Sequence, residues 1–465
     1  MTIAASPRFC VAICALLIVG SLGYGLLQVP LQVNDSLQKI VEAGRSPGVW
    51  ASFTSEIGTT DFRPLWVAEI KLLFDLSHGH VHIAYKAFHI ALLLAAFALF
   101  IAALRIETGA DVAASLFALS VLVGSNTFTG LVKEATPVNV YLPIVVLVLL
   151  AMRLSRSPHA WWVDAAAALT LIAACLTLES GVLVWVALVA GRVAGGRGVS
   201  DRALLCITVV VVVYLTVRLT LLPLDTQNTS GYLAERLEPE QIRERFGEGF
   251  SRFSIYTVLA SISSVLFSEP RDGTVVLLRA WKAGDIPPRM WISLASSVMT
   301  TVLIGVTAWR LSGSVTAAAE PHRDDMRADF FVFGAILAAS AVVSFSYAKD
   351  VIMSAAGACY ALVAFWAVRD QLIRVRRVGT AVAMAAVLVA ASSLWAVRVI
   401  GVHHVLRTQA FAFHNDWAEV RDHLPDDPAG RRLVTALRAE ALSKPVVNPW
   451  FVPRWADRVF DIDYF

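Results

Sequence analysis

Long apolar blocks recur along the chain, and most approach the ~20 residues that a helix needs to cross the hydrocarbon core of a bilayer. They cover residues 9–28, 84–104, 112–125, 137–152, 161–178, 180–191, 203–222, 291–309, 329–347, 351–368 and 378–400. Because a backbone in lipid must satisfy its own hydrogen bonds, each block is expected to be a helix. Charged residues make up only 16% of the 465 residues, against about 25% in soluble domains. The sequence predicts an all-α, polytopic membrane bundle of about 11 transmembrane helices.

The distribution of positive charge predicts the orientation of these helices. We expect residues 9–28 to be a retained first helix, because the residues that follow offer no small-x-small cleavage site. With the N-terminus in the cytoplasm, the turns 105–111, 153–160, 192–202, 310–328 and 369–377 fall on the cytoplasmic side and are rich in arginine. The short turns on the opposite side, 126–136 and residue 179, hold Lys133 as their single basic residue. The predicted C-terminus is therefore extracytoplasmic.

Three long polar segments then fall together on the outer side: residues 29–83, 223–290 and a tail, 401–465. The first contains two stretches with the apolar spacing of amphipathic helices. The stretch "EPEQIRERFGEGFSRF" in the second is expected to form a helix of mixed charge. We expect residues 1–400 to form one transmembrane module with ordered outer loops, which suggests a site at the outer membrane interface.

Residues 29–83 hold the first candidates for chemistry. Asp35 follows the first predicted helix directly, at the depth of a lipid headgroup, and could act as a general base or orient a sugar. The alternative is a helix N-cap role for Asp35 or a neighbour. Further along, Arg63 could hold a phosphate with two parallel hydrogen bonds, or form a structural pair with Asp61. Pro64 suits the first turn of a helix.

Histidines gather where the second predicted membrane helix begins. His82 and His89 are seven residues apart, on one face of that helix, and are expected to hydrogen-bond within the bundle or line a pocket. His78, His80 and His82 alternate, which suggests a metal site only if that segment is extended. No acidic residue closer than Asp75 completes such a site, so no metal ligand is predicted. A divalent metal remains possible as a cofactor.

Other charged residues lie at predicted outer ends of helices. Lys133 and Glu134 share a short turn and could form an ion pair or bind substrate. Glu179 and Arg218 are ionisable residues near the membrane, where such residues are candidates for a site, although an arginine there can also extend towards the interface. Lys349 precedes a predicted helix and suits an anionic phosphate.

Several of these segments, in this order, resemble motifs of the type C (GT-C fold) membrane glycosyltransferases that use lipid-linked sugars, and most closely the protein O-mannosyltransferase-like branch. The likeness spans most of the chain and rests on order and placement. It comprises Asp35 after the first helix, "RPL" at 63–65, His82 and His89 of a "yHlxNxxxH" motif, "YLTVR" ending at Arg218, "KDVIMSAAG" with Lys349 and Gly357, and "HNDWAEVRDHL" with Asn415, Trp417 and Leu424. Tyr85 stands where that family usually has Asn, and Asn34-Asp35 replaces its usual pair of acids.

The resemblance implies a glycosyltransferase of the inner (plasma) membrane that takes a hexosyl group from a polyprenyl-phosphate sugar. Asp35 would activate the acceptor, a glycan, lipid or protein of the cell envelope. Arg218 and Lys349 would bind the donor phosphate, with Asp61, Arg63, His82, His89, Lys133 and Glu134 as further substrate-binding residues. The partners implied are these substrates and membrane lipid, with no nucleic acid. No nucleotide-binding motif such as GxxxxGK[ST] occurs in the chain.

Two other classes of function fit a polytopic protein with polar outer loops. An O-antigen polymerase or ligase would depend on cations in residues 223–290, namely Arg236, Arg243 and Arg245. A transporter or flippase for lipid-linked sugars predicts inverted repeats and ionisable residues at mid-membrane. We find no repeat, and the helix interiors are expected to be nearly free of charge.

Overall fold

The computed structural model describes residues 6–33, 35–57, 62–133, 137–221, 240, 243, 250–268, 273–313, 322–344, 350–374, 378–420, 427–443, 446 and 452–460. Every regular element among them is helical. The N-terminal half comprises α1 (Pro7–Gln28), α2 (Asp35–Arg45), α3 (Val49–Ser55), α4 (Pro64–Leu76), α5 (Val81–Ala103), α6 (Gly109–Gly124), α7 (Asn126–Lys133), α8 (Tyr141–Arg156), α9 (Trp161–Thr177), η1 (Glu179–Gly181), α10 (Val182–Val193), α11 (Asp201–Thr216) and η2 (Val217–Leu221).

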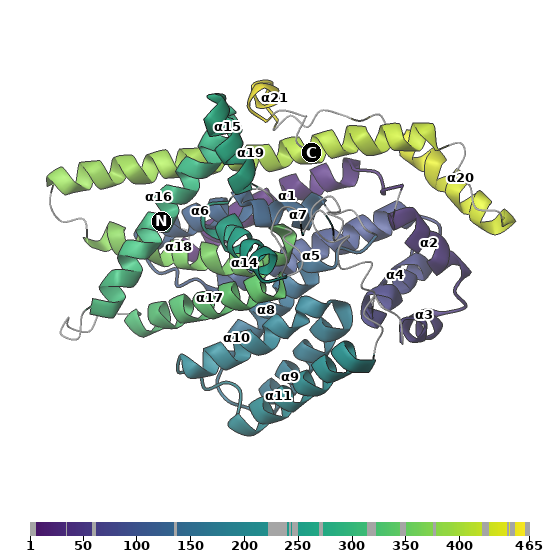
Figure 1. The fold of residues 1–465 in the computed structure, drawn as a ribbon, viewed down its shortest axis with the longest axis horizontal. Coiled ribbons are helices and arrows are strands. Elements are labelled where there is room, and N and C mark those ends of the chain that lie inside the picture. The colour runs from purple at the N-terminus through teal and green to yellow at the C-terminus, as the bar shows by residue number, and fades with distance from the viewer. Residues whose placement is uncertain are drawn as a thin grey trace, which may run out of the picture.

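The rest comprises α14 (Phe250–Leu266), α15 (Gly273–Ala283), α16 (Pro288–Gly313), α17 (Arg323–Val343), η3 (Asp350–Met353), α18 (Ser354–Arg374), α19 (Val378–Glu419), α20 (Pro428–Ser443) and α21 (Ala456–Val459). Figure 1 shows the long helices lying roughly side by side, with α2, α3, α4 and α20 gathered at one end of the bundle. The predicted all-α architecture is confirmed.

Six helices of the described chain are long and apolar enough to cross a membrane: α1, α5, α16, α17, α18 with η3, and most of α19. A seventh candidate is the bent pair α6 and α7, which meet at 61°. The predicted count of about 11 is not confirmed, because α8, α9, α10 and α11 are helices of 12 to 17 residues. A straight helix of that length falls short of the ~20 residues that a full crossing requires.

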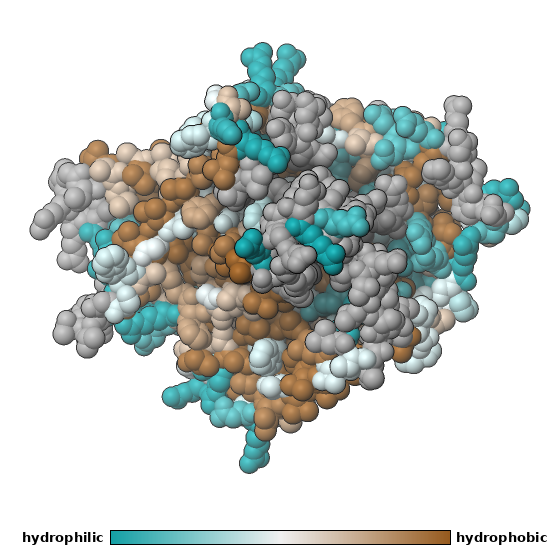
Figure 2. Space-filling model, in the orientation of Figure 1, coloured by the Kyte–Doolittle hydropathy of each residue, from teal (hydrophilic) through white to brown (hydrophobic). Residues whose placement is uncertain are grey.

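The centre of the bundle is α18, which packs against α6, α8, α16 and α17. In its candidate span 94% of the residues are buried, whereas α1, α5, α16, α17 and α19 bury only 33–39% of theirs. Alanine, glycine and serine dominate the first turns of α18, and such small residues let helices approach closely. The surrounding helices expose large apolar side chains, which form the broad brown areas in Figure 2. A surface this apolar is that of a membrane protein.

The ends of the helices carry the polar interactions. The ion pairs between described side chains join charges that the arginine pattern assigns to the same side of the membrane, such as Arg105 with Asp325, Arg369 with Asp111 and Arg45 with Asp427. Exposed tryptophans also lie at helix ends, as in the interfacial belts of membrane proteins: Trp161 and Trp309 on one predicted side, Trp50 and Trp281 on the other.

Three details differ from the sequence-based expectations. The tail predicted to start at residue 401 begins inside α19, a continuous helix of 42 residues and therefore about 63 Å long. Within 223–290, which was expected to be a polar outer segment, α14 contains the apolar stretch Ile255–Leu266 and packs against α7, α16, α17 and α18. The helix interiors also hold charge, because Lys86 and Arg398 are 4% and 5% exposed. Arg398 donates to the hydroxyls of Ser296 and Ser297, which offset its burial.

Candidate functional site

Two arginines predicted from sequence converge on one carboxylate. Arg63 Nη2 lies 3.3 Å from Glu179 Oε2, and Arg218 Nη2 lies 3.1 Å from Glu179 Oε1. The three residues are 116 and 39 positions apart in the chain. Asp61 lies outside the described residues. The structure adds a contact that the sequence did not predict, because Arg63 and Arg218 both pair with Glu179. We call these three residues the arginine cluster.

The local backbone structure at each residue positions the three side chains of the arginine cluster. Pro64 occupies the first turn of α4, as predicted, and Arg63 is its N-cap residue without a side-chain capping bond. Glu179 starts η1, a short 3₁₀ turn between α9 and α10. Arg218 lies in η2, a five-residue π-helical turn that continues α11. Single π turns of this kind are frequent at functional sites because they rotate side chains off the regular helical positions.

The electrostatics of the arginine cluster favour a bound anion. Burial raises the pKa of Glu179, but Arg63, a backbone hydrogen bond and Arg218 together hold that pKa below its ordinary value of 4.5. Glu179 is therefore ionised at neutral pH, and the cluster carries one net positive charge. The side chains of Arg63 and Arg218 are 19% and 16% exposed, and Nη1 of Arg218 is buried without a hydrogen-bond partner. A phosphate oxygen could accept from such a group.

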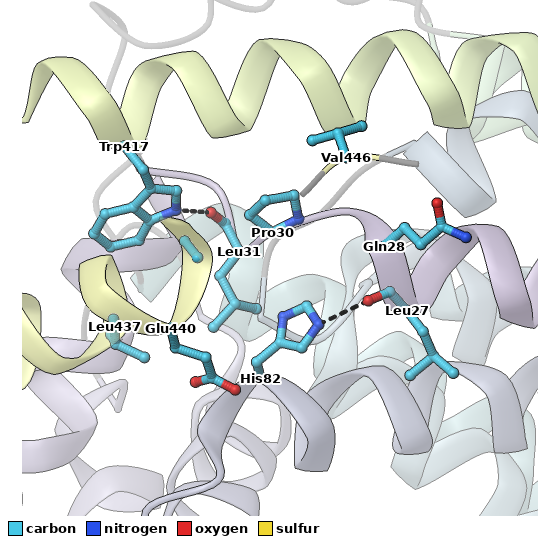
Figure 3. A pocket seen from close by; sticks show the side chains of 10 residues that line it. Leu27, Gln28, Pro30, Leu31, His82, Trp417, Leu437, Glu440 and Val446 are labelled. Atoms are coloured by element: carbon cyan, nitrogen blue, oxygen red, sulfur yellow. Dashed lines mark hydrogen bonds between the residues drawn. The ribbon is translucent and has the colours of Figure 1, made fainter. Parts of the chain in front are cut away.

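His82 lies in a cavity at the end of α1. Its Nε2 is 3.1 Å from the carbonyl oxygen of Leu27, so this nitrogen carries the proton and donates it. In Figure 3, His82 from α5 lies between Glu440 of α20 on one side and Leu27 of α1 on the other. The cavity has a volume of about 30 Å³, room for on the order of two water-sized groups. His82 thus makes a hydrogen bond within the bundle and also lines a pocket, the two alternatives expected for it.

His89 lies deeper on the same face of α5. It is 7% exposed, and its Nε2 has no hydrogen-bond partner. Lys86, between the two histidines on this face, is equally buried and makes no ion pair with any described residue. Lys86 was not among the predicted site residues, although its place inside an apolar block was a visible signal.

The helix α4 connects the arginine cluster with the helices that surround the cavity beside His82. It begins next to the arginine cluster and packs against α2, which starts at Asp35, and against α5, which carries His82. Trp66 of α4 donates from Nε1 to the carbonyl of Val138 at 2.7 Å, which fixes α4 against the loop before α8. On the same helix, burial raises the pKa of Glu69 to about 7.

Of the other predicted site residues, only Lys133 has a side chain within the described part of the structure. Asp35 is the first residue of α2, and its side chain lies outside the described part. Asp61, Glu134 and Lys349 also lie outside the described residues. Lys133 ends α7, where its carbonyl accepts a hydrogen bond from Gln409 and its charge interacts with Arg289 and Asp350. The structure thus places Lys133 beside α16 and α19, near a second group of charges.

The last candidates are the alternating histidines and the arginines that a polymerase or ligase would need. His78 and His80 are exposed, and no three His, Cys, Asp or Glu side chains in the described part lie close enough together to hold a metal ion. Among the arginines that a polymerase or ligase would need, Arg243 is exposed, while Arg236 and Arg245 are outside the described residues. Gln28 and Glu440 line the cavity beside His82 but were not predicted, since neither belongs to a motif.

Comparison with protein-family models, with curated proteins and with solved structures finds no match for this chain.

Proposed function

We propose that this protein is a membrane glycosyltransferase that moves a sugar from a polyprenyl-phosphate donor to a glycan, lipid or protein acceptor at the outer face of the plasma membrane. The single observation that carries the proposal is the arginine cluster. Two arginines from distant segments, both implied by the resemblance, meet at one carboxylate and leave a net positive charge near the ends of α4 and α11. This arrangement suits the phosphate of an anionic lipid.

The proposed topology keeps the N-terminus in the cytoplasm and the arginine cluster outside. It also keeps about 11 membrane segments, with the bent pair α6 and α7 and the short helices α8 to α11 inserted in the bilayer beside the six longer ones. Two observations support it. The ion pairs respect the predicted sides, and α8 and α10 are largely buried within the bundle, where a helix shorter than the bilayer can be accommodated.

In the proposed reaction the acceptor hydroxyl oxygen attacks the anomeric carbon of the donor sugar. The new bond from this oxygen to carbon forms as the bond from carbon to the phosphate oxygen breaks, with inversion at that carbon. Asp35 takes the hydroxyl proton. The leaving phosphate gains negative charge, which Arg63 and Arg218 stabilise in a site partly shielded from water. No nucleophile from the protein is required.

The test is mass-spectrometric profiling of envelope glycans and lipids from cells that produce Asp35→Asn at the level of the unchanged protein. We expect loss of one glycosylated product, because the amide cannot accept the proton. Asp285→Asn is the matched control, since Asp285 is an exposed carboxylate in a segment predicted to be outside, and it should leave the profile unchanged. An identical profile in the Asp35→Asn cells refutes the proposal.

A further inference from the structure

The cavity beside His82 contains polar groups that the protein itself leaves without partners. Both amide atoms of Gln28 are buried and make no hydrogen bond. The carboxylate of Glu440 faces the same cavity and makes no ion pair or hydrogen bond with the described residues. A buried polar group without a partner costs about 1–3 kcal/mol. The buried amide of Gln28, next to the partly exposed carboxylate of Glu440, indicates a ligand that satisfies the amide.

The wall that carries Glu440 is held firmly in place. Arg438 of α20 donates from Nε to the carbonyl of Trp417 at 2.9 Å and from Nη2 to the carbonyl of Ala418 at 3.1 Å. Trp417 in turn donates from its indole to the carbonyl of Leu31, at the end of α1, at 2.7 Å. These bonds fix the segment that follows α1, the end of α19 and α20 relative to one another. The fold therefore positions α20, which places Glu440 in the lining of the cavity.

The lining indicates the chemistry of the ligand. Glu440 is the one acidic side chain among the lining residues, and its charge disfavours a phosphate or carboxylate in this cavity. The amide of Gln28 can both donate and accept, while the carboxylate of Glu440 accepts. The rest of the lining is largely apolar, with Leu31 and Leu437 among it. Hydroxyl groups on a ring with apolar C–H faces match this combination, and such mixed lining is typical of small-molecule sites.

We infer that this cavity, lined by Gln28, His82 and Glu440, binds the hydroxyl-bearing edge of a neutral sugar, and that α20 thereby forms the acceptor subsite. The cavity volume of about 30 Å³ admits one or two hydroxyl groups and not a whole ring. Leu31 is part of the lining, and α2 begins four residues later at Asp35. The description of the bound sugar as the acceptor rests on the proposed function, whereas the binding itself does not.

The experiment is a titration of the purified full-length protein in detergent micelles with methyl α-D-glucoside, methyl α-D-mannoside and methyl α-D-galactoside, followed by saturation-transfer NMR. We expect at least one glycoside to bind the unchanged protein. The Kd should rise about tenfold in Glu440→Gln, which keeps the side-chain volume, and also in Gln28→Leu. Glu42→Gln, the same change at a half-exposed carboxylate of α2 that pairs with Lys39, should bind as before.

Two results would overturn the inference: absence of binding by all three glycosides, or an unchanged Kd in both Glu440→Gln and Gln28→Leu. Asp35→Asn separates this inference from the proposed function. If the glycosides bind Asp35→Asn normally and that variant leaves the envelope profile intact, the sugar site stands and the transferase proposal fails. If the envelope profile changes but no glycoside binds, the transferase proposal stands and the sugar site fails.

Discussion

Replacement of Glu179 by glutamine removes the negative charge between Arg63 and Arg218 and keeps the size of the side chain. The two hydrogen bonds concerned, at 3.3 and 3.1 Å, are longer than the roughly 2.7–2.9 Å of the strongest charged pairs. Each therefore contributes about 1 kcal/mol, below the roughly 1.5–3 kcal/mol of well-formed bonds to charged groups. Glutamine can still accept one bond, but the two guanidinium groups then repel each other without compensation. We expect the free energy of unfolding to fall by about 2 kcal/mol.

The pH dependence of this loss tests the cause. The pKa of Glu179 is lower in the folded protein than its ordinary value of 4.5. The ionised carboxylate therefore stabilises the fold fully above pH 4.5, and this stabilisation is lost as the pH falls through the lower folded pKa. The difference between the unchanged protein and Glu179→Gln should be complete at pH 7 and should shrink below pH 4.5.

The assay is reversible unfolding by SDS in mixed micelles, followed by circular dichroism at pH 7 and again below pH 4.5. Glu42→Gln serves as the control, because its carboxylate is 43% exposed and pairs with Lys39, so its loss should cost less than about 1 kcal/mol. If Glu179→Gln loses no more stability than this control, or loses the same amount at both pH values, the reasoning about the arginine cluster is wrong.

Two further substitutions test the packing and charge of the fold. Burial raises the pKa of Glu69 to about 7, so the ionised carboxylate costs stability in the folded protein. Glu69→Gln should therefore be more stable than the unchanged protein above pH 7, by at most about 3 kcal/mol, and about equal to it below pH 4.5. SDS unfolding across this pH range measures the difference, and a difference that does not depend on pH contradicts the prediction. Gly357→Ala should lower the unfolding free energy by about 1–3 kcal/mol, since a Cβ there would lie 2.1 Å from Thr127 Oγ1. Gly305→Ala, where a Cβ meets nothing within 4 Å, should be neutral or stabilising by up to about 1 kcal/mol in the same assay, and equal losses in both variants would contradict the packing argument.

The positions of the helices could be read from the sequence with good accuracy. The blocks predicted at 161–178 and 291–309 became α9 (Trp161–Thr177) and α16 (Pro288–Gly313). Hydropathy and backbone hydrogen bonding are local properties, so they mark a helix wherever it lies in the fold. The number of membrane crossings could not be read from the sequence as directly. The helices α8 to α11 are short, and the helices packed around them decide how deeply these four are inserted.

The candidate site was predicted in part. Arg63, Arg218 and His82 were predicted site residues; the first two lie in the arginine cluster, and His82 lines the cavity. The sequence did not predict that Glu179 would join the two arginines. Pairing of that kind depends on how α4, α9 and α11 are rotated and tilted against each other, which packing determines and hydropathy does not.

The sequence by itself determined that this chain forms apolar helices suited to a membrane, and where most of them begin and end. The tertiary structure alone decided which charges meet, that α19 continues unbroken to Glu419, and that α20 returns to place Glu440 beside His82. The physical reason is the distance along the chain over which each property is determined. Helix formation in lipid depends on each segment's own residues, whereas a cavity forms only when segments hundreds of positions apart pack together, as Leu31 and Trp417 do here.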